Sequence, residues 1–153
     1  RTVTRIYQAF VVGKISKSGK IDEPIGRHPS NRQKQSVLSS GKEAITHYSL
    51  EATYGNYSHL FLRLETGRTH QIRVHMNYLG NSIVGDDKYK KKFKKIKNIS
   101  PLLEKNIVNL NRQFLHDSTI GFFHPKKRKE MIFNSILPQE LEIILKMLRN
   151  TDK

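Results

Sequence analysis

Residues 59–65 constrain the fold of this chain more than any other stretch, because their side chains alternate strictly. In "HLFLRLE", Leu60, Leu62 and Leu64 face one way, and Phe61, Arg63 and Glu65 face the other. A period of two residues predicts a strand with one face on the core and one face toward solvent. Such a strand is typical of an antiparallel sheet.

A helix is predicted directly after this strand. Thr66-Gly67 ends the strand, Thr69 can cap a helix of about ten residues, and Gly80 can close it. Ile72, Met76 and Leu79 recur at i, i+4 and i+7 and form its predicted buried stripe. The segment "TGRTHQIRVH" at this junction is unusually rich in arginine and histidine, so it is a candidate functional site.

The remaining pattern predicts an α+β fold, with a mixed, mostly antiparallel sheet and a few flanking helices. The 153 residues fit one domain, 1–153. Further strands are expected within 5–15, 44–54, 112–125 and 131–136, and a last helix begins at Pro138 with Leu141, Ile144, Leu145 and Leu148 on its apolar face. Two basic loops are expected, at 26–43 and 86–100.

The charge of the chain points to a polyanionic partner. There are 28 lysines and arginines against 13 acidic residues, giving a formal net charge of +15. Self-repulsion on this scale does not help a fold, and nucleic acid is the usual partner of such a clustered excess. A lysine-rich composition without a partner is the alternative. We expect no membrane partner, because no basic amphipathic helix with an apolar face stands out and no apolar run could span a bilayer.

The sequence has no cysteine, which suits a reducing compartment, and we expect a cytoplasmic protein. The chain begins at Arg1, so we expect a piece of a longer polypeptide.

Metal-dependent and covalent chemistry are poorly supported. His70 and His75 are five residues apart, so a helix directs them to different sides, and no acidic cluster could hold magnesium. No serine lies in a nucleophile-elbow pattern. We therefore expect no metal site, and a metal-dependent nuclease is the least favoured alternative.

Anion binding is better supported at the strand-to-helix junction. Arg68 and Arg73 carry guanidinium groups suited to phosphates and carboxylates, and Gly67 permits close approach of the backbone. Arg27, Arg32 and Lys34 add positive charge from the first basic loop.

The segment "LETGRTHQIRVHMNYLGNSIVGDDKY" at 64–89 closely resembles a signature of the RluA/RluD-type ribosomal large-subunit pseudouridine synthases. Further motifs of this family resemble three other stretches, "TRIYQAFVVG" at 4–13, "FLHDSTIGFFHP" and "MIFNSILP". The sequences of these motifs are nearest to those of the RluD branch. The resemblance implies conversion of uridine to its C-glycoside isomer in large-subunit ribosomal RNA, without a cofactor or metal. The target base must leave its stack to be reached.

The resemblance also assigns roles to residues. It implies that Tyr7 is the active-site tyrosine, that Arg73 pairs with the catalytic aspartate, and that Leu115 lines the pocket of the base. Arg68, His70 and Gln71 would hold nearby backbone or RNA. Further RNA contacts are expected from the basic loops, at Arg27, Arg32, Lys88, Lys90, Lys91 and Lys92.

This sequence departs from the family at one decisive place. The catalytic aspartate of the family lies in an "HRLD" motif upstream of the tyrosine, and no "HRLD" occurs here. Other aspartates, among them Asp86, lie in other motifs, so we expect Arg73 to lack its carboxylate partner within this chain. The chain alone is therefore expected to be inactive and to work with the missing N-terminal part of the same enzyme. A non-catalytic basic RNA-binding module is the alternative.

Overall fold

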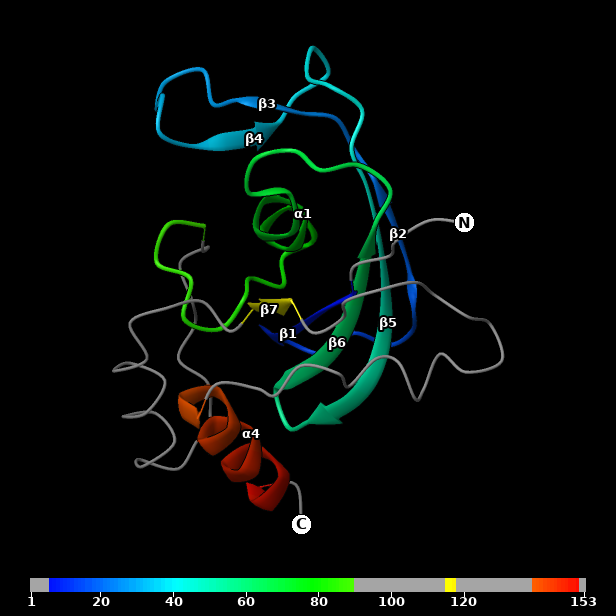
Figure 1. Cartoon of the computed structure of the whole chain (residues 1–153), viewed down its shortest axis with the longest axis vertical. Helices are drawn as coiled ribbons and strands as arrows, with labels where there is room; N and C mark the ends of the chain where they lie inside the picture. Colours follow the sequence, from blue (N-terminus) through cyan, green and yellow to red (C-terminus); the bar gives the residue numbers. More distant parts are fainter. Residues whose placement is uncertain (1–5, 90–114, 118–138, 152–153) are drawn as a thin grey trace.

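A computed structural model describes residues 6–89, 115–117 and 139–151. Its centre is a five-stranded sheet in the order β2-β5-β6-β1-β7 (Figure 1). The strands of this sheet are β1 (Ile6–Val12), β2 (Gly19–Asp22), β5 (Ile45–Tyr54), β6 (Tyr57–Leu64) and β7 (Leu115–Asp117). Every pairing within it is antiparallel, which confirms the expected α+β class with an antiparallel sheet.

β6 is buried on both faces, so the expectation of a half-buried strand was wrong. Leu60 and Leu62 belong to the main core, as predicted. On the other face, Phe61 is also buried, and the ring of His59 stacks on Phe10 with 4.5 Å between centroids. Only toward the end of the strand, at Arg63, does the outer face become exposed.

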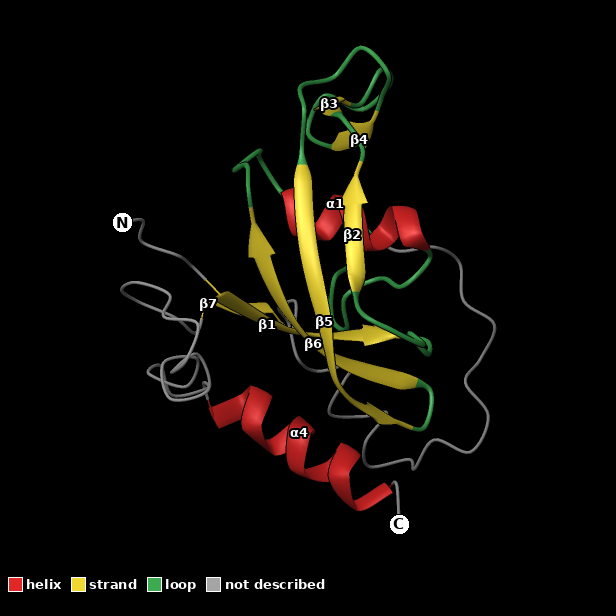
Figure 2. Cartoon of the chain, turned by 90° about the vertical axis from the view of Figure 1, so that its right-hand side faces the viewer, coloured by secondary structure: helices red, strands yellow, loops and turns green. Residues whose placement is uncertain are grey.

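Two helices accompany the sheet in the described part of the chain. Helix α1 (Gln71–Leu79) packs against β5, and α4 (Gln139–Thr151) packs against the same strand (Figure 2). The helix expected after Pro138 is confirmed, and its Leu141, Ile144 and Leu145 are buried in the main core. No helix among the described residues has the length and apolar character needed to cross a lipid bilayer.

Two details of α1 differ from prediction. His70, not Thr69, precedes the helix, in a left-handed conformation with φ of 57° and without a side-chain cap. Gly80 closes the helix as predicted, with φ of 90°. Leu79 is 40% exposed, so it is not part of the buried stripe. The buried side chains of α1 face two clusters, with Ile72 and Met76 in the main core and Val74 in a second cluster.

The second cluster packs a small β-hairpin against α1. Residues 26–43, expected as a loop, contain most of β3 (Ile25–Arg27) and all of β4 (Gln35–Val37), which pair antiparallel. Ile25 packs with Ala44, Val74 and Tyr89. Gly41 lies against the hairpin so closely that an added Cβ would be 2.5 Å from the carbonyl carbon of Ile25. The hairpin is thus fixed to α1 and to the segment after it.

The segments predicted as strands at 112–125 and 131–136 lie outside the described residues, except for β7. The second basic loop, 86–100, is described only as far as Tyr89.

Candidate functional site

The turn between β6 and α1 is organised by Gln71, which is buried. Its Oε1 accepts hydrogen bonds from the Thr66 hydroxyl (2.8 Å) and from the backbone N–H of Arg68 (3.0 Å). Its Nε2 donates to the Ile45 carbonyl and to the Thr46 hydroxyl, both at 3.0 Å. Both ends of the amide are therefore used inside the protein. Of the two expectations for Gln71, this geometry favours holding backbone over contacting RNA.

Tyr89 joins the start of α1 to the hairpin. Its hydroxyl accepts the backbone N–H of Gln35 at 2.9 Å and lies 2.7 Å from Nδ1 of His70. Burial, followed by the charges of Arg73 and Lys88, lowers the pKa of His70. A neutral ring can accept the Tyr89 hydroxyl proton at Nδ1. This bond fixes the side chain of His70 at a residue whose backbone is in the left-handed region.

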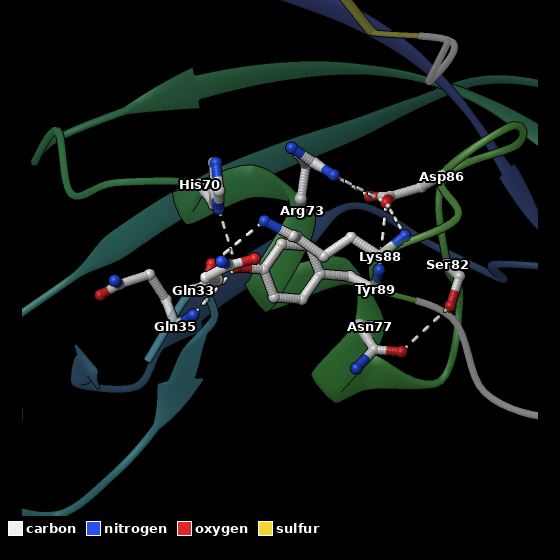
Figure 3. A network of polar contacts seen from close by, with 9 residues as sticks. All are labelled: Gln33, Gln35, His70, Arg73, Asn77, Ser82, Asp86, Lys88 and Tyr89. Carbon is white, nitrogen blue, oxygen red and sulfur yellow. Dashed lines mark hydrogen bonds and ion pairs between the residues drawn. The ribbon is translucent and has the colours of Figure 1, made fainter. Parts of the chain in front are cut away.

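Arg73 is held from the side by Asp86, as Figure 3 shows. Nε and Nη2 of Arg73 each donate to one carboxylate oxygen of Asp86, both at 2.9 Å. The Asp86 side chain is completely buried, and its Oδ1 also accepts the backbone N–H groups of Lys88 (3.1 Å) and Tyr89 (3.0 Å). Arg73 thus has a carboxylate partner within this chain that the sequence did not predict, whereas the absence of the catalytic aspartate from the chain stays a prediction.

The pair with Asp86 does not use all of the guanidinium. Arginine has five N–H donors, and the side-on pair occupies two of them. The edge formed by Nη1 and the second N–H of Nη2 can serve another carboxylate or a phosphate. In Figure 3 one terminal nitrogen of Arg73 points away from Asp86. The hydrogen bonds that Arg73 donates to Asp86 raise the pKa of Arg73, so the guanidinium stays cationic.

The ring of Tyr89 supports Arg73 from below. The guanidinium carbon lies 5.0 Å from the centroid of this ring, within the range of a cation–π interaction. Arg73 is thus fixed by a carboxylate on one edge and by an aromatic face.

Tyr7 and Leu115, the other two predicted catalytic residues, lie on adjacent strands. Tyr7 of β1 is opposite Asp117 of β7, and Ala9 is opposite Leu115. Because residues two apart on a strand share a face, the side chains of Tyr7 and Leu115 are diagonal neighbours. Both are partly buried against the main core, to which Ile72 and Met76 of α1 also belong.

The predicted RNA-binding residues are spread over the hairpin and the junction. Arg27 and Arg32 are exposed on the hairpin, and Nε of Arg68 donates to the Glu43 carbonyl at 2.7 Å. The ammonium group of Lys88 donates to the Gln33 carbonyl at 3.1 Å. Lys90, Lys91 and Lys92 lie outside the described residues.

His75 is a structural residue rather than a ligand. Its Nδ1 lies 2.7 Å from the Thr46 hydroxyl, and its Nε2 lies 2.8 Å from the Glu23 carbonyl. Burial lowers the pKa of His75. Within the described residues, no three histidine or acidic side chains gather in a group that could hold a metal ion.

Comparison with known proteins identifies the family. A family model described as RNA pseudouridylate synthase matches residues 1–78, which include β1, the hairpin, β6 and most of α1. The chain belongs to the RNA pseudouridylate synthase family.

Curated members of this family are similar over nearly the whole chain. An uncharacterized RNA pseudouridine synthase of Chloroflexus aurantiacus is 42% identical over 98% of this chain and 44% of its own length. The ribosomal large subunit pseudouridine synthase D of Pseudomonas aeruginosa is 41% identical over 97% of this chain and 47% of its own length. The chain thus spans about half the length of the curated relatives it matches.

A solved structure of the family confirms the fold. Human RNA pseudouridylate synthase domain containing 4 superposes with a TM-score of 0.67 at 21% identity, over 96% of this chain and 62% of that one.

Sequence reasoning missed Asp86 and Tyr89, although both stand in the quoted signature 64–89. "GDDKY" was read as part of a motif without a role. The available signal was the spacing, since a turn after α1 can bring a carboxylate 13 residues away back to the arginine.

Proposed function

We propose that this chain forms part of an enzyme that isomerises uridine to pseudouridine in large-subunit ribosomal RNA, in the cytoplasm. The observation that carries the proposal is the similarity, over nearly the whole chain, to curated relatives named ribosomal large subunit pseudouridine synthase D. The formal charge of +15 supports an RNA partner.

In this proposal Tyr7 and Leu115 line the site of the flipped uracil. An aromatic face and an apolar neighbour on adjacent strands suit a planar base, since stacking on a ring contributes about 1–3 kcal/mol. Arg73 presents its open edge to the catalytic aspartate. A neighbouring guanidinium lowers the pKa of a carboxyl group and so keeps it ionised at neutral pH.

We further propose that this aspartate comes from outside residues 1–153. The "HRLD" motif does not occur in the sequence, and the Asp86 carboxylate is buried and already bound by Arg73 and by two backbone N–H groups. Asp86 is therefore poorly placed to act on a substrate, and its proposed task is to hold Arg73.

Tritium release from ribosomal RNA labelled at carbon 5 of uridine tests the proposal. We expect no release by residues 1–153 alone. A chimera that carries the upstream half of the Pseudomonas aeruginosa relative before Arg1 should release tritium, and Arg73→Ala in the same chimera should abolish release. Release by residues 1–153 alone would refute the statement that the aspartate lies elsewhere.

The alternative function is a basic RNA-binding module without catalysis. It is favoured if the folded chimera binds the labelled RNA and yet releases no tritium.

A further inference from the structure

A hollow of about 250 Å³ lies between the β3–β4 hairpin and α1. Its walls come from three segments, namely the hairpin, the middle of α1 and the turn at Lys88 and Tyr89. Val74 and Tyr89, both buried, form part of its lining, so the base of the hollow is firmly packed. In both overall views the hairpin and α1 lie above β1 and β7, which carry Tyr7 and Leu115 (Figures 1 and 2).

The lining of this hollow is suited to an anion. It includes Lys34 and Lys88, and none of the described residues that line it carries a carboxylate. The Lys88 ammonium donates to the Gln33 carbonyl, which uses one of its three N–H donors. The Lys34 ammonium lies 5.9 Å from the centroid of the Tyr89 ring. Both lysines therefore contribute to the lining of the hollow, Lys34 from the hairpin side and Lys88 from the turn that also carries Tyr89.

His28 adds an N–H donor on the hairpin side. Its Nδ1 accepts the backbone N–H groups of Ser30 and Asn31, both at 3.1 Å. An accepting Nδ1 places the proton of a neutral ring on Nε2. His28 therefore offers this lining a donor and not an acceptor.

The α1 wall offers a planar face and an amide. Tyr78 is 49% exposed, although it is a large aromatic side chain on a helix that otherwise packs against two clusters. Beside it, Asn77 accepts the Ser82 hydroxyl at its Oδ1 with 3.1 Å, which leaves the Nδ2 side of the amide to donate (Figure 3). An exposed ring next to an amide donor suits an unstacked nucleobase.

We propose that this hollow binds one nucleotide of single-stranded RNA, with the phosphate between Lys34 and Lys88 and the base on Tyr78. The volume is just below the usual range for small-ligand pockets, roughly 300–1,000 Å³, so it accommodates one nucleotide and not a duplex. The choice of RNA over other anions rests on the proposed function. The bound nucleotide is distinct from the uridine at Tyr7, so this subsite positions RNA and takes no part in the chemistry.

Salt dependence of binding tests the phosphate contacts. Fluorescein-labelled hexauridylate is titrated with the whole chain, and the dissociation constant is measured by anisotropy at several salt concentrations. Each of Lys34→Ala and Lys88→Ala should reduce the slope of log affinity against log salt by about 0.7, the value for one phosphate contact in a single strand. The arginine variants Lys34→Arg and Lys88→Arg should keep the slope. Lys20→Ala, which removes the same charge at an exposed position on β2, is the matched control and should leave the slope unchanged.

Stacking is tested separately at Tyr78. Tyr78→Ala should weaken hexauridylate binding about 5- to 150-fold, the equivalent of about 1–3 kcal/mol, and Tyr78→Phe should bind like the wild type. Leu79→Ala, at the neighbouring exposed side chain, should have no effect.

Unchanged binding by Tyr78→Ala together with unchanged slopes in both lysine variants would overturn the subsite, and so would a wild-type chain that does not bind hexauridylate. Neither result bears on the proposed enzyme, because tritium release by the chimera decides that question independently.

Discussion

The sheet and the hairpin region are stabilised by different interactions. In the sheet, β1 and β6 bury a contiguous set of apolar side chains, including Phe10, Leu60 and Leu62. In the part of the chain that the structure describes, the hairpin packs on a cluster of four buried residues and depends on polar contacts around Tyr89 and Asp86. Apolar burial is non-directional, whereas hydrogen bonds and ion pairs fix orientation. The first region therefore supplies stability, and the second supplies geometry for Arg73 and the proposed nucleotide subsite.

The largest effect is expected from a cavity in the sheet region. Leu60 is fully buried, so Leu60→Ala should lower the free energy of unfolding by about 2–5 kcal/mol. Urea denaturation measures this loss. Leu79→Ala is the matched control, because this leucine is 40% exposed, and it should cost less than about 0.5 kcal/mol. Equal losses would mean that Leu79 is buried after all.

Breaking the ion pair should have the next largest effect. Asp86→Asn removes the negative charge that Arg73 faces. It also replaces one accepting carboxylate oxygen by an NH₂ group, which cannot accept a hydrogen bond from the guanidinium. Loss of one partner of a buried pair costs about 3–5 kcal/mol, and because Arg73 keeps 16% exposure we expect about 2–3 kcal/mol. The Nε–H resonance of Arg73 should shift and exchange faster with solvent. Asp22→Asn, at an exposed position on β2, is the control and should change neither quantity.

The two regions also differ in how well the sequence predicted them. The antiparallel sheet, α4 and the Gly80 end of α1 were predictable, because alternation, apolar periodicity and glycine caps are local signals. Burial of both faces of β6 was not, since it depends on residues far away in the sequence. The hairpin was missed because strands of three residues, such as Ile25–Arg27, carry almost no periodic signal.

The candidate site shows the same division. Arg73 was found from its motif, but its partner Asp86 depends on how the chain returns after α1. His70 as the residue before the helix could not be foreseen either, because its left-handed backbone is associated with a tertiary contact to Tyr89.

Acid should weaken the sheet region through His59. Burial, followed by the charge of Arg149, lowers the pKa of this histidine from 6.5 to about 4. The unfolded chain therefore takes up a proton between pH 6.5 and 4 that the folded chain does not, so the free energy of unfolding falls as the pH falls through this window. At pH 5 the loss relative to pH 7 should be about 2 kcal/mol.

His59→Gln isolates this contribution, because His70 and His75 have pKa values lowered in the same direction. Glutamine keeps a donor for Gln8 Oε1, which lies 3.1 Å from Nε2 of His59, but it does not titrate. Denaturation is measured at pH 7 and pH 5 for both proteins. The fall in the free energy of unfolding between these pH values should be about 2 kcal/mol smaller in the variant than in the wild type. An identical loss in both proteins would assign the pH dependence to other groups.

The smallest effect, and the one that best separates geometry from stability, is expected at the Tyr89 hydroxyl. Tyr89→Phe keeps the ring that supports Arg73 and fills the second cluster, but it removes the contacts to His70 and to the backbone of Gln35. We expect a loss of only about 1–2 kcal/mol in the free energy of unfolding, because each hydrogen bond contributes about 1 kcal/mol net.

The main effect of Tyr89→Phe should be local and should appear in hydrogen exchange at Gln35. The Gln35 amide loses its acceptor, so its hydrogen exchange should accelerate. The exchange rates of amides in β1 and β6 should change only as far as the free energy of global unfolding changes. Tyr78→Phe, which removes a hydroxyl from an exposed ring, should change neither quantity. If Tyr89→Phe leaves the exchange of Gln35 unchanged, the hairpin is held by its apolar cluster alone, and the division between a stabilising sheet and an orienting polar region does not extend to β4.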